Sequence, residues 1–97
     1  MRFDADGPVG DQATSEQLSW SLGWKRWLAR EGLTAADVTA SVWTLDAGVT
    51  KLGETNVDGV TSVLITIDDT ATRYRLDNTI TAGSLKKTAS IWIERKS

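Results

Sequence analysis

The sequence contains no cysteine and no histidine. Without cysteine, no disulfide bond can hold the fold together, and zinc sites built from cysteine and histidine are excluded. Without histidine, a histidine general base and a Ser-His-Asp triad are excluded as well. These absences remove the commonest side chains of catalysis and metal binding. We therefore expect a protein that is not an enzyme and that holds no cofactor and no metal.

Long apolar runs are also missing. No run approaches the roughly 20 residues that span a bilayer, and the N-terminus lacks the apolar segment of a signal peptide. The glycines near the N-terminus do not have the spacing of a phosphate-binding loop. We expect no membrane partner. The lack of cysteine favours folding in a reducing cytoplasm.

Neither sign of charge dominates, since 11 basic and 13 acidic residues give a net charge of −2. The basic excess that marks a nucleic-acid binder is absent, so we expect no nucleic-acid partner. The 97 residues correspond to one domain, which at this size buries roughly two-thirds of its unfolded surface.

Residues 1–14 differ from the rest of the chain in composition. They are rich in aspartate and glycine and carry few apolar side chains, so we expect a flexible N-terminal arm. The stretch from Asp4 to Gly7 starts like a calcium loop, but Val9 and Ser15 stand where that loop needs acidic ligands. Within the arm, Phe3 is a candidate for contact with a partner.

Residues 15–97 are expected to form one folded domain. Apolar and polar residues alternate in six segments, at residues 16–23, 38–46, 49–54, 60–67, 72–81 and 87–95. The spacing of eight to twelve residues predicts an antiparallel sandwich or barrel, and the one-sided alternation favours the sandwich. The prediction is an all-β, immunoglobulin-like antiparallel sandwich of about six or seven strands. A short helical segment is predicted near residues 24–31, ended by Gly32.

The five tryptophans are the main candidates for the core. Trp20 and Trp43 lie on predicted strands and are expected to be buried, while Trp24 and Trp27 are expected to pack over one open end of the sandwich. Trp92 alternates with buried positions and is assigned to neither face. Exposed tryptophans could instead stack on sugars, which leaves a carbohydrate-binding module as an alternative.

Tyr74 follows the Asp68-Asp69 turn and begins a predicted strand. This placement resembles the tyrosine corner of immunoglobulin-like sandwiches, in which the hydroxyl bonds back to the preceding backbone. Tyr74 is therefore predicted to belong to the structural core. The aspartate pair itself is interpreted as a polar turn.

Several motifs along the chain are similar to those of a known family. They are Gly23-Trp24-Lys25-Arg26-Trp27-Leu28, Ser41-Val42-Trp43-Thr44, Tyr74-Arg75-Leu76-Asp77-Asn78-Thr79-Ile80-Thr81 and Ser90-Ile91-Trp92-Ile93-Glu94. In order and spacing, over roughly residues 16 to 95, they resemble short phage and prophage proteins known as fiber–tail adaptor proteins. Gly23 departs from the aspartate of that family, and the segment before residue 15 does not match it. The resemblance implies an immunoglobulin-like virion component that joins tail parts and has no enzymatic activity.

The expected function is that of a non-enzymatic phage virion structural protein that attaches fibers or other appendages to the tail. Expected partners are other virion proteins of the tail, fiber or connector, with several copies in a symmetric ring. Such a protein is made in the bacterial host cytoplasm and is located in the tail region of the virion. Besides Phe3, the candidate interface residues lie in one predicted hairpin, namely Gly83, Ser84, Lys86 and Lys87. A head–tail connector, a tail or capsid decoration protein and a carbohydrate-binding immunoglobulin-like module remain alternatives.

Overall fold

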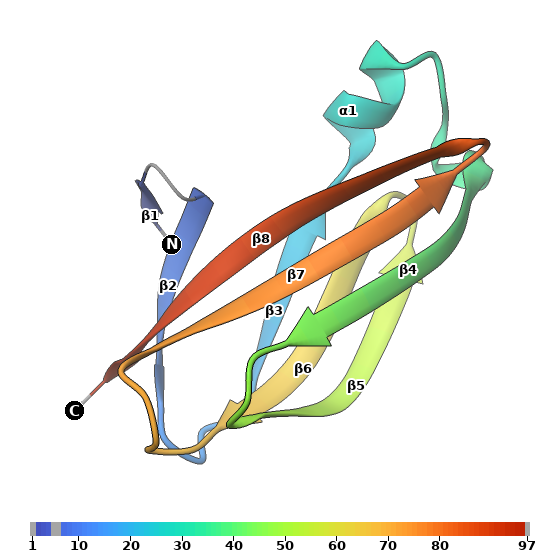
Figure 1. Cartoon of the computed structure of the whole chain (residues 1–97). Helices are drawn as coiled ribbons and strands as arrows, with labels where there is room; N and C mark the ends of the chain where they lie inside the picture. The colour runs from blue at the N-terminus through green and yellow to red at the C-terminus, as the bar shows by residue number, and fades with distance from the viewer. Residues whose placement is uncertain (1, 5–6, 97) are drawn as a thin grey trace.

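Two β-sheets packed face to face form the protein (Figure 1). The computed structural model describes residues 2–4 and 7–96, with side chains from Gly10 onward. The larger sheet has the strand order β1-β2-β8-β7-β4, and the smaller sheet has the order β3-β6-β5. The strands are β1 (Arg2–Asp4), β2 (Gly7–Ala13), β3 (Leu18–Gly23), β4 (Val38–Leu45), β5 (Val49–Val57), β6 (Val60–Ile67), β7 (Arg73–Ala82) and β8 (Leu85–Lys96). The predicted all-β sandwich is confirmed.

The connectivity is that of an immunoglobulin-like sandwich. One sheet contains β3, β6 and β5, and the centre of the other contains β4, β7 and β8. With β2 counted as the first strand, this is the division of strands between the two sheets of an immunoglobulin domain. The cysteine pair that joins the sheets in antibody domains is absent. In that fold the second cysteine comes two residues after the corner tyrosine. Here Leu76 takes that place relative to Tyr74, and its side chain is fully buried.

The flexible arm predicted for residues 1–14 lies partly outside the described residues, and its described part contains two strands. Gly7–Ala13 form β2, which pairs with β8 in parallel, so the larger sheet is not wholly antiparallel as expected. Residues Arg2–Asp4 form the short β1, paired with β2. The composition of this segment was misleading, because few apolar side chains hold β2 in place. β2 is instead held by main-chain pairing with β8 and by the buried polar side chain of Gln12.

Gln12 and Gly10 fit β2 against the smaller sheet. The side-chain amide of Gln12 donates to the carbonyl of Ile65 at 3.2 Å and accepts a 2.8 Å bond from the Trp20 indole N–H. Gly10 lies directly against the Trp20 ring, where a β-carbon would overlap the ring atoms. The close approach of β2 to Trp20 therefore requires glycine at position 10.

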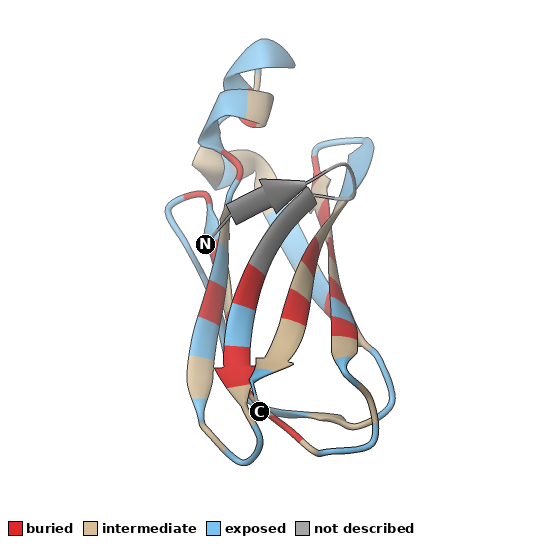
Figure 2. Ribbon diagram, turned by 90° about the vertical axis from the view of Figure 1, so that its left-hand side faces the viewer, coloured by how far each residue is buried: buried red, intermediate tan, exposed pale blue. Residues whose placement is uncertain are grey.

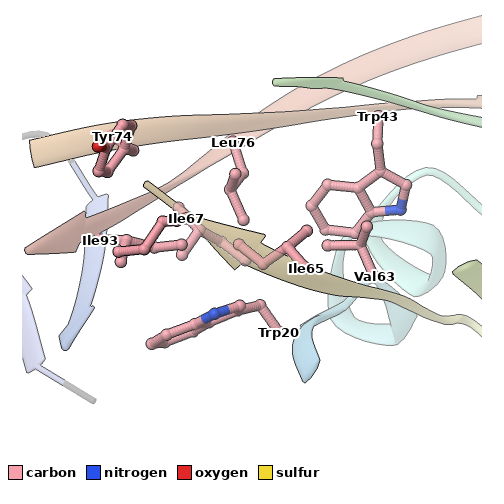
Figure 3. Close-up of a cluster of buried hydrophobic side chains, with 9 residues drawn as sticks. Trp20, Trp43, Val63, Ile65, Ile67, Tyr74, Leu76 and Ile93 are labelled. Carbon is pink, nitrogen blue, oxygen red and sulfur yellow. The ribbon is translucent and has the colours of Figure 1, made fainter. Parts of the chain in front are cut away.

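The core lies between the two sheets, where alternate residues of each strand point inward. Burial alternates residue by residue along β6 and β7, as period-two side-chain direction requires. Figure 2 shows buried residues alternating with less buried ones along strands that face the viewer. The main cluster joins both sheets (Figure 3). Its members are Trp20, Trp43, Val63, Ile65, Ile67, Tyr74, Leu76, Ile91 and Ile93.

A helical connection between β3 and β4 covers one end of the sandwich. Helix α1 (Lys25–Arg30) falls within the predicted range, and a 3-10 turn, η1 (Ala35–Asp37), follows it. Gly32 has a φ of 73°, so it provides the left-handed residue that ends the helix. A second apolar cluster lies beneath α1 and consists of Trp24, Leu28, Ile80 and Ala82, with Trp27 packed against it. No helix in the described ranges has the length and apolar character needed to cross a membrane.

Candidate interaction surface

Three connections meet at the end of the sandwich that carries the helix. We define the α1 end as residues 25–37 together with the β5–β6 turn (residues 57–60) and the β7–β8 turn (residues 82–87). The Trp24 amide donates to the carbonyl of Gly59 at 2.8 Å, and the Gly83 amide donates to the carbonyl of Asp37 at 3.1 Å. These bonds tie both hairpin turns to the helical connection. Figure 1 shows the three segments at the same end of the sandwich.

A buried polar network supports this end from below. The Trp24 indole N–H lies 2.9 Å from Thr61 Oγ1 and 3.1 Å from Asn78 Oδ1, and the Thr61 hydroxyl donates to Asn78 Oδ1 at 2.6 Å. The Asn78 side-chain amide then donates to the Val42 carbonyl at 3.2 Å. The network connects β6, β7 and β4 with the residue that precedes α1. Because its polar groups are paired, burial of Thr61 and Asn78 carries little desolvation penalty.

The sequence interpretation missed the role of Asn78 and Thr61. Along β7, Asn78 shares one strand face with Tyr74, Leu76 and Ile80, all of which are buried. A polar residue at an inward position of a β-strand needs a buried hydrogen-bond partner. A polar residue at this inward position was therefore the feature of the sequence that could have indicated a buried hydrogen bond. The partner itself could not be identified, because it depends on the packing of α1 against the sheets.

The surface of the α1 end combines apolar and basic side chains. Val57 is 67% exposed at the β5–β6 turn, and Val60 and Leu85 are 38% and 40% exposed. The exposed basic residues of this end are Lys25, Arg26, Arg30, Lys86 and Lys87. Lys25 forms a 2.9 Å ion pair with the exposed Asp58. Exposed apolar groups surrounded by polar ones are typical of protein–protein contact surfaces.

The predicted interface residues divide between two places. Gly83, Ser84, Lys86 and Lys87 are exposed and lie together at the α1 end, around the β7–β8 turn. Gly83 has a φ of 59°, which suits the tight turn between the two strands. Phe3 lies in β1 opposite Pro8, and its side chain is outside the described part of the chain.

The tryptophans do not form an open aromatic surface. Trp20, Trp24 and Trp43 are buried, and Tyr74 is buried with them. Trp27 is half-buried, and its ring meets Trp24 edge-on with centroids 6.1 Å apart.

Trp92 lies on the outer face of the larger sheet and is half-buried. The guanidinium carbons of Arg73 and Arg75 lie 4.5 and 5.7 Å from its ring centroid, within the range of cation–π contacts. Arg75 also forms a 3.2 Å ion pair with Asp77. The indole is thus flanked by two arginines rather than open on both sides.

The opposite end of the sandwich is organised by Tyr74 and Asp68. The Tyr74 hydroxyl lies 3.0 Å from the Asp68 carbonyl and accepts a 3.1 Å bond from the Ala71 amide, as expected for a tyrosine corner. Hydrogen bonds from the Thr70 and Tyr74 side chains hold the pKa of the Asp68 carboxyl below its usual value. An open depression beside it contains Asp68 and Asp69. Within the described ranges, no group of three or more acidic residues is arranged to hold a metal ion.

No family model matches this chain, and no curated protein matches it. The resemblance to fiber–tail adaptor proteins therefore remains an expectation from the motifs quoted above.

Proposed function

We propose that this chain is a non-enzymatic structural protein of a phage virion, an adaptor that attaches fibers or other appendages to the tail. Its partners are other virion proteins, present in a ring of several copies. The α1 end supports this proposal best, because it presents exposed apolar and basic side chains on a surface tied together by hydrogen bonds. Such a surface suits binding to another protein with little rearrangement.

The burial and ring contacts of the tryptophans favour this proposal over a carbohydrate-binding module. Sugar binding by stacking requires an aromatic face that is open to solvent. Trp20, Trp24 and Trp43 are buried. The ring of Trp27 contacts Trp24, and the ring of Trp92 is covered on one side by Arg73. The described part of the chain therefore offers little open indole surface to a glycan.

The proposal is tested by the double substitution Val57→Glu with Leu85→Glu. These side chains are exposed, so the fold should persist, while two charges would be placed in the contact surface. We expect particles assembled with the variant to lose both this protein and the appendages attached through it. Mass spectrometry of purified particles measures the first loss, and electron microscopy measures the second.

Leu52→Glu provides the matched control, because Leu52 is 46% exposed on β5 outside the α1 end. This control should be incorporated as the unmodified chain is. Purified particles from the source genome that contain no copy of the unmodified chain would overturn the virion role. Normal appendages on particles that carry the double variant would overturn the role of the α1 end.

A further inference from the structure

The free edges of the two sheets are protected to different degrees. At the β5 edge of the smaller sheet, the pairing register shifts between Lys51 and Gly53, and Lys51 pairs with Glu54 at 3.3 Å. Bulges and charged side chains of this kind oppose pairing with another chain. At the β3 edge of the same sheet, Gln12 from β2 bonds to Trp20.

The β4 edge of the larger sheet has no such charged protection. β4 is the last strand in the sheet order, and none of its residues from Val38 to Leu45 is charged or proline. Its register with β7 shifts once, between Val38 and Ala40 at the start of the strand, and is continuous from Ala40 to Leu45. An uncharged, regular edge strand presents unpaired backbone groups on which another strand can form hydrogen bonds.

The outward side chains of β4 are also apolar or neutral. Val42 is 58% exposed near the middle of the strand, between the exposed Ala40 and Thr44. A groove of about 190 Å³ runs beside this edge, lined by Thr39, Ala40 and Ser41 of β4 and by Glu54, Thr55 and Asn56 of β5. The one charged group in this lining, Glu54, is paired with Lys51 on its own strand. The strand therefore combines an open backbone edge with an exposed apolar side chain at its centre.

Trp43, the neighbour of Val42 on this edge strand, is incompletely paired. Its indole N–H is buried and has no hydrogen-bond partner. Figure 3 shows the nitrogen on the side of the ring away from Tyr74 and Ile93. An unpaired buried donor costs about 1–3 kcal/mol, and buried polar groups in folded proteins normally find a partner.

We propose that β4 pairs antiparallel with β4 of a second copy of this chain across a twofold axis at Val42. In this register Val42 lies opposite Val42 of the second copy, Ala40 lies opposite Thr44, and Ser41 lies opposite Trp43. No like charges meet in these pairs, because the strand has no charge. A charged partner strand would lose solvation at this edge without gaining an ion pair, whereas a second copy brings an equally uncharged strand. The two larger sheets then join into one continuous sheet.

This inference does not depend on the virion role, because it concerns the chain alone. The absence of native cysteine gives a direct test, since a single introduced thiol can form only an intermolecular disulfide. Cross-strand partners bring β-carbons close to the spacing that a disulfide requires. We expect Val42→Cys to form a disulfide-linked dimer under mild oxidation. Val57→Cys is the control, because Val57 is more exposed than Val42 but lies at a turn outside the proposed contact.

The oligomeric state of the unmodified chain provides the second measurement. We expect sedimentation to give twice the monomer mass, and Val42→Lys to return the mass to that of the monomer through repulsion at the twofold axis. Leu52→Lys, on the edge strand of the other sheet, should leave the dimer intact. A monomeric unmodified chain at high concentration would overturn the inference. So would equal disulfide yields from Val42→Cys and Val57→Cys, or dissociation by Leu52→Lys but not by Val42→Lys.

Discussion

The Tyr74 hydroxyl lies 2.7 Å from Oδ1 of Asp68, six residues earlier in the chain. The same carboxylate oxygen accepts bonds from the Thr70 amide at 3.0 Å and from the Thr70 hydroxyl at 2.6 Å. Tyr74 is the second residue of β7, and Asp68 directly follows β6, so this contact fixes the turn between strands that belong to different sheets.

Tyr74→Phe is expected to destabilise the protein by about 1–3 kcal/mol. The phenylalanine ring would keep the apolar packing of a side chain that is 1% exposed, but the Ala71 amide and the Asp68 oxygens would lose their partner. Urea unfolding followed by tryptophan fluorescence measures the difference. An unchanged midpoint would show that water replaces the hydroxyl at no cost.

Asp68 should contribute to the acid sensitivity of the fold. Hydrogen bonds from Thr70 and then Tyr74 lower the pKa of its carboxyl below the ordinary value of 3.8, so the folded state favours the ionised form. The resulting stability is fully present above that ordinary value and is lost as the pH falls through the lowered folded-state pKa. Asp68→Asn should therefore destabilise the protein at neutral pH, and its deficit should shrink in strong acid. Thermal unfolding across pH checks this, with Asp69→Asn as the matched control.

Two tryptophans of similar burial should respond differently to the loss of the indole N–H. Trp24 is 4% exposed and donates toward Thr61 and Asn78, whereas Trp43 is 8% exposed and its N–H has no partner. Trp24→Phe should cost about 1–3 kcal/mol more than Trp43→Phe in the separated chain, because it leaves a buried acceptor network incomplete. Equilibrium unfolding of both variants at low concentration measures the difference, and equal costs would contradict the network's contribution.

The approach of β2 to the smaller sheet should depend on the absence of a side chain at Gly10. A β-carbon there would overlap the ring of Trp20, so Gly10→Ala should cost about 1–3 kcal/mol through overpacking. Gly53→Ala is the control, because a β-carbon at Gly53 meets no atom within 4 Å. Combining Gly10→Ala with Trp20→Phe should recover part of the loss. A Gly10→Ala variant as stable as the original chain would show that β2 can shift away from Trp20 without penalty.

The regular alternation of the sequence was sufficient to predict most strands. β6 was predicted with its observed bounds, because Val63, Ile65 and Ile67 mark one face without interruption. The corner role of Tyr74 was predicted as well, since it depends on a short turn and one nearby backbone group. The predicted helical segment near Trp24 contains α1.

The strand formed by Gly7–Ala13 could not be predicted from composition. β2 is held by main-chain pairing with β8, about eighty positions later in the chain, and by Gln12, whose partners come from β3 and β6. Neither kind of bond leaves an apolar period in the sequence of β2. The partners of Asn78 were missed for a related reason, because Trp24 reaches it only after α1 has packed against the end of the sandwich.

The sequence by itself indicated the alternation of inward and outward residues along strands such as β6 and β7, because side-chain direction along a strand follows from local backbone geometry. It also excluded chemistry that needs cysteine or histidine. Only the tertiary structure decided that β2 joins β8 in parallel, that the two hairpin turns meet at the α1 end, and that β4 is left as an uncharged edge. These features depend on which strands become neighbours, which is set by packing between residues far apart in the chain.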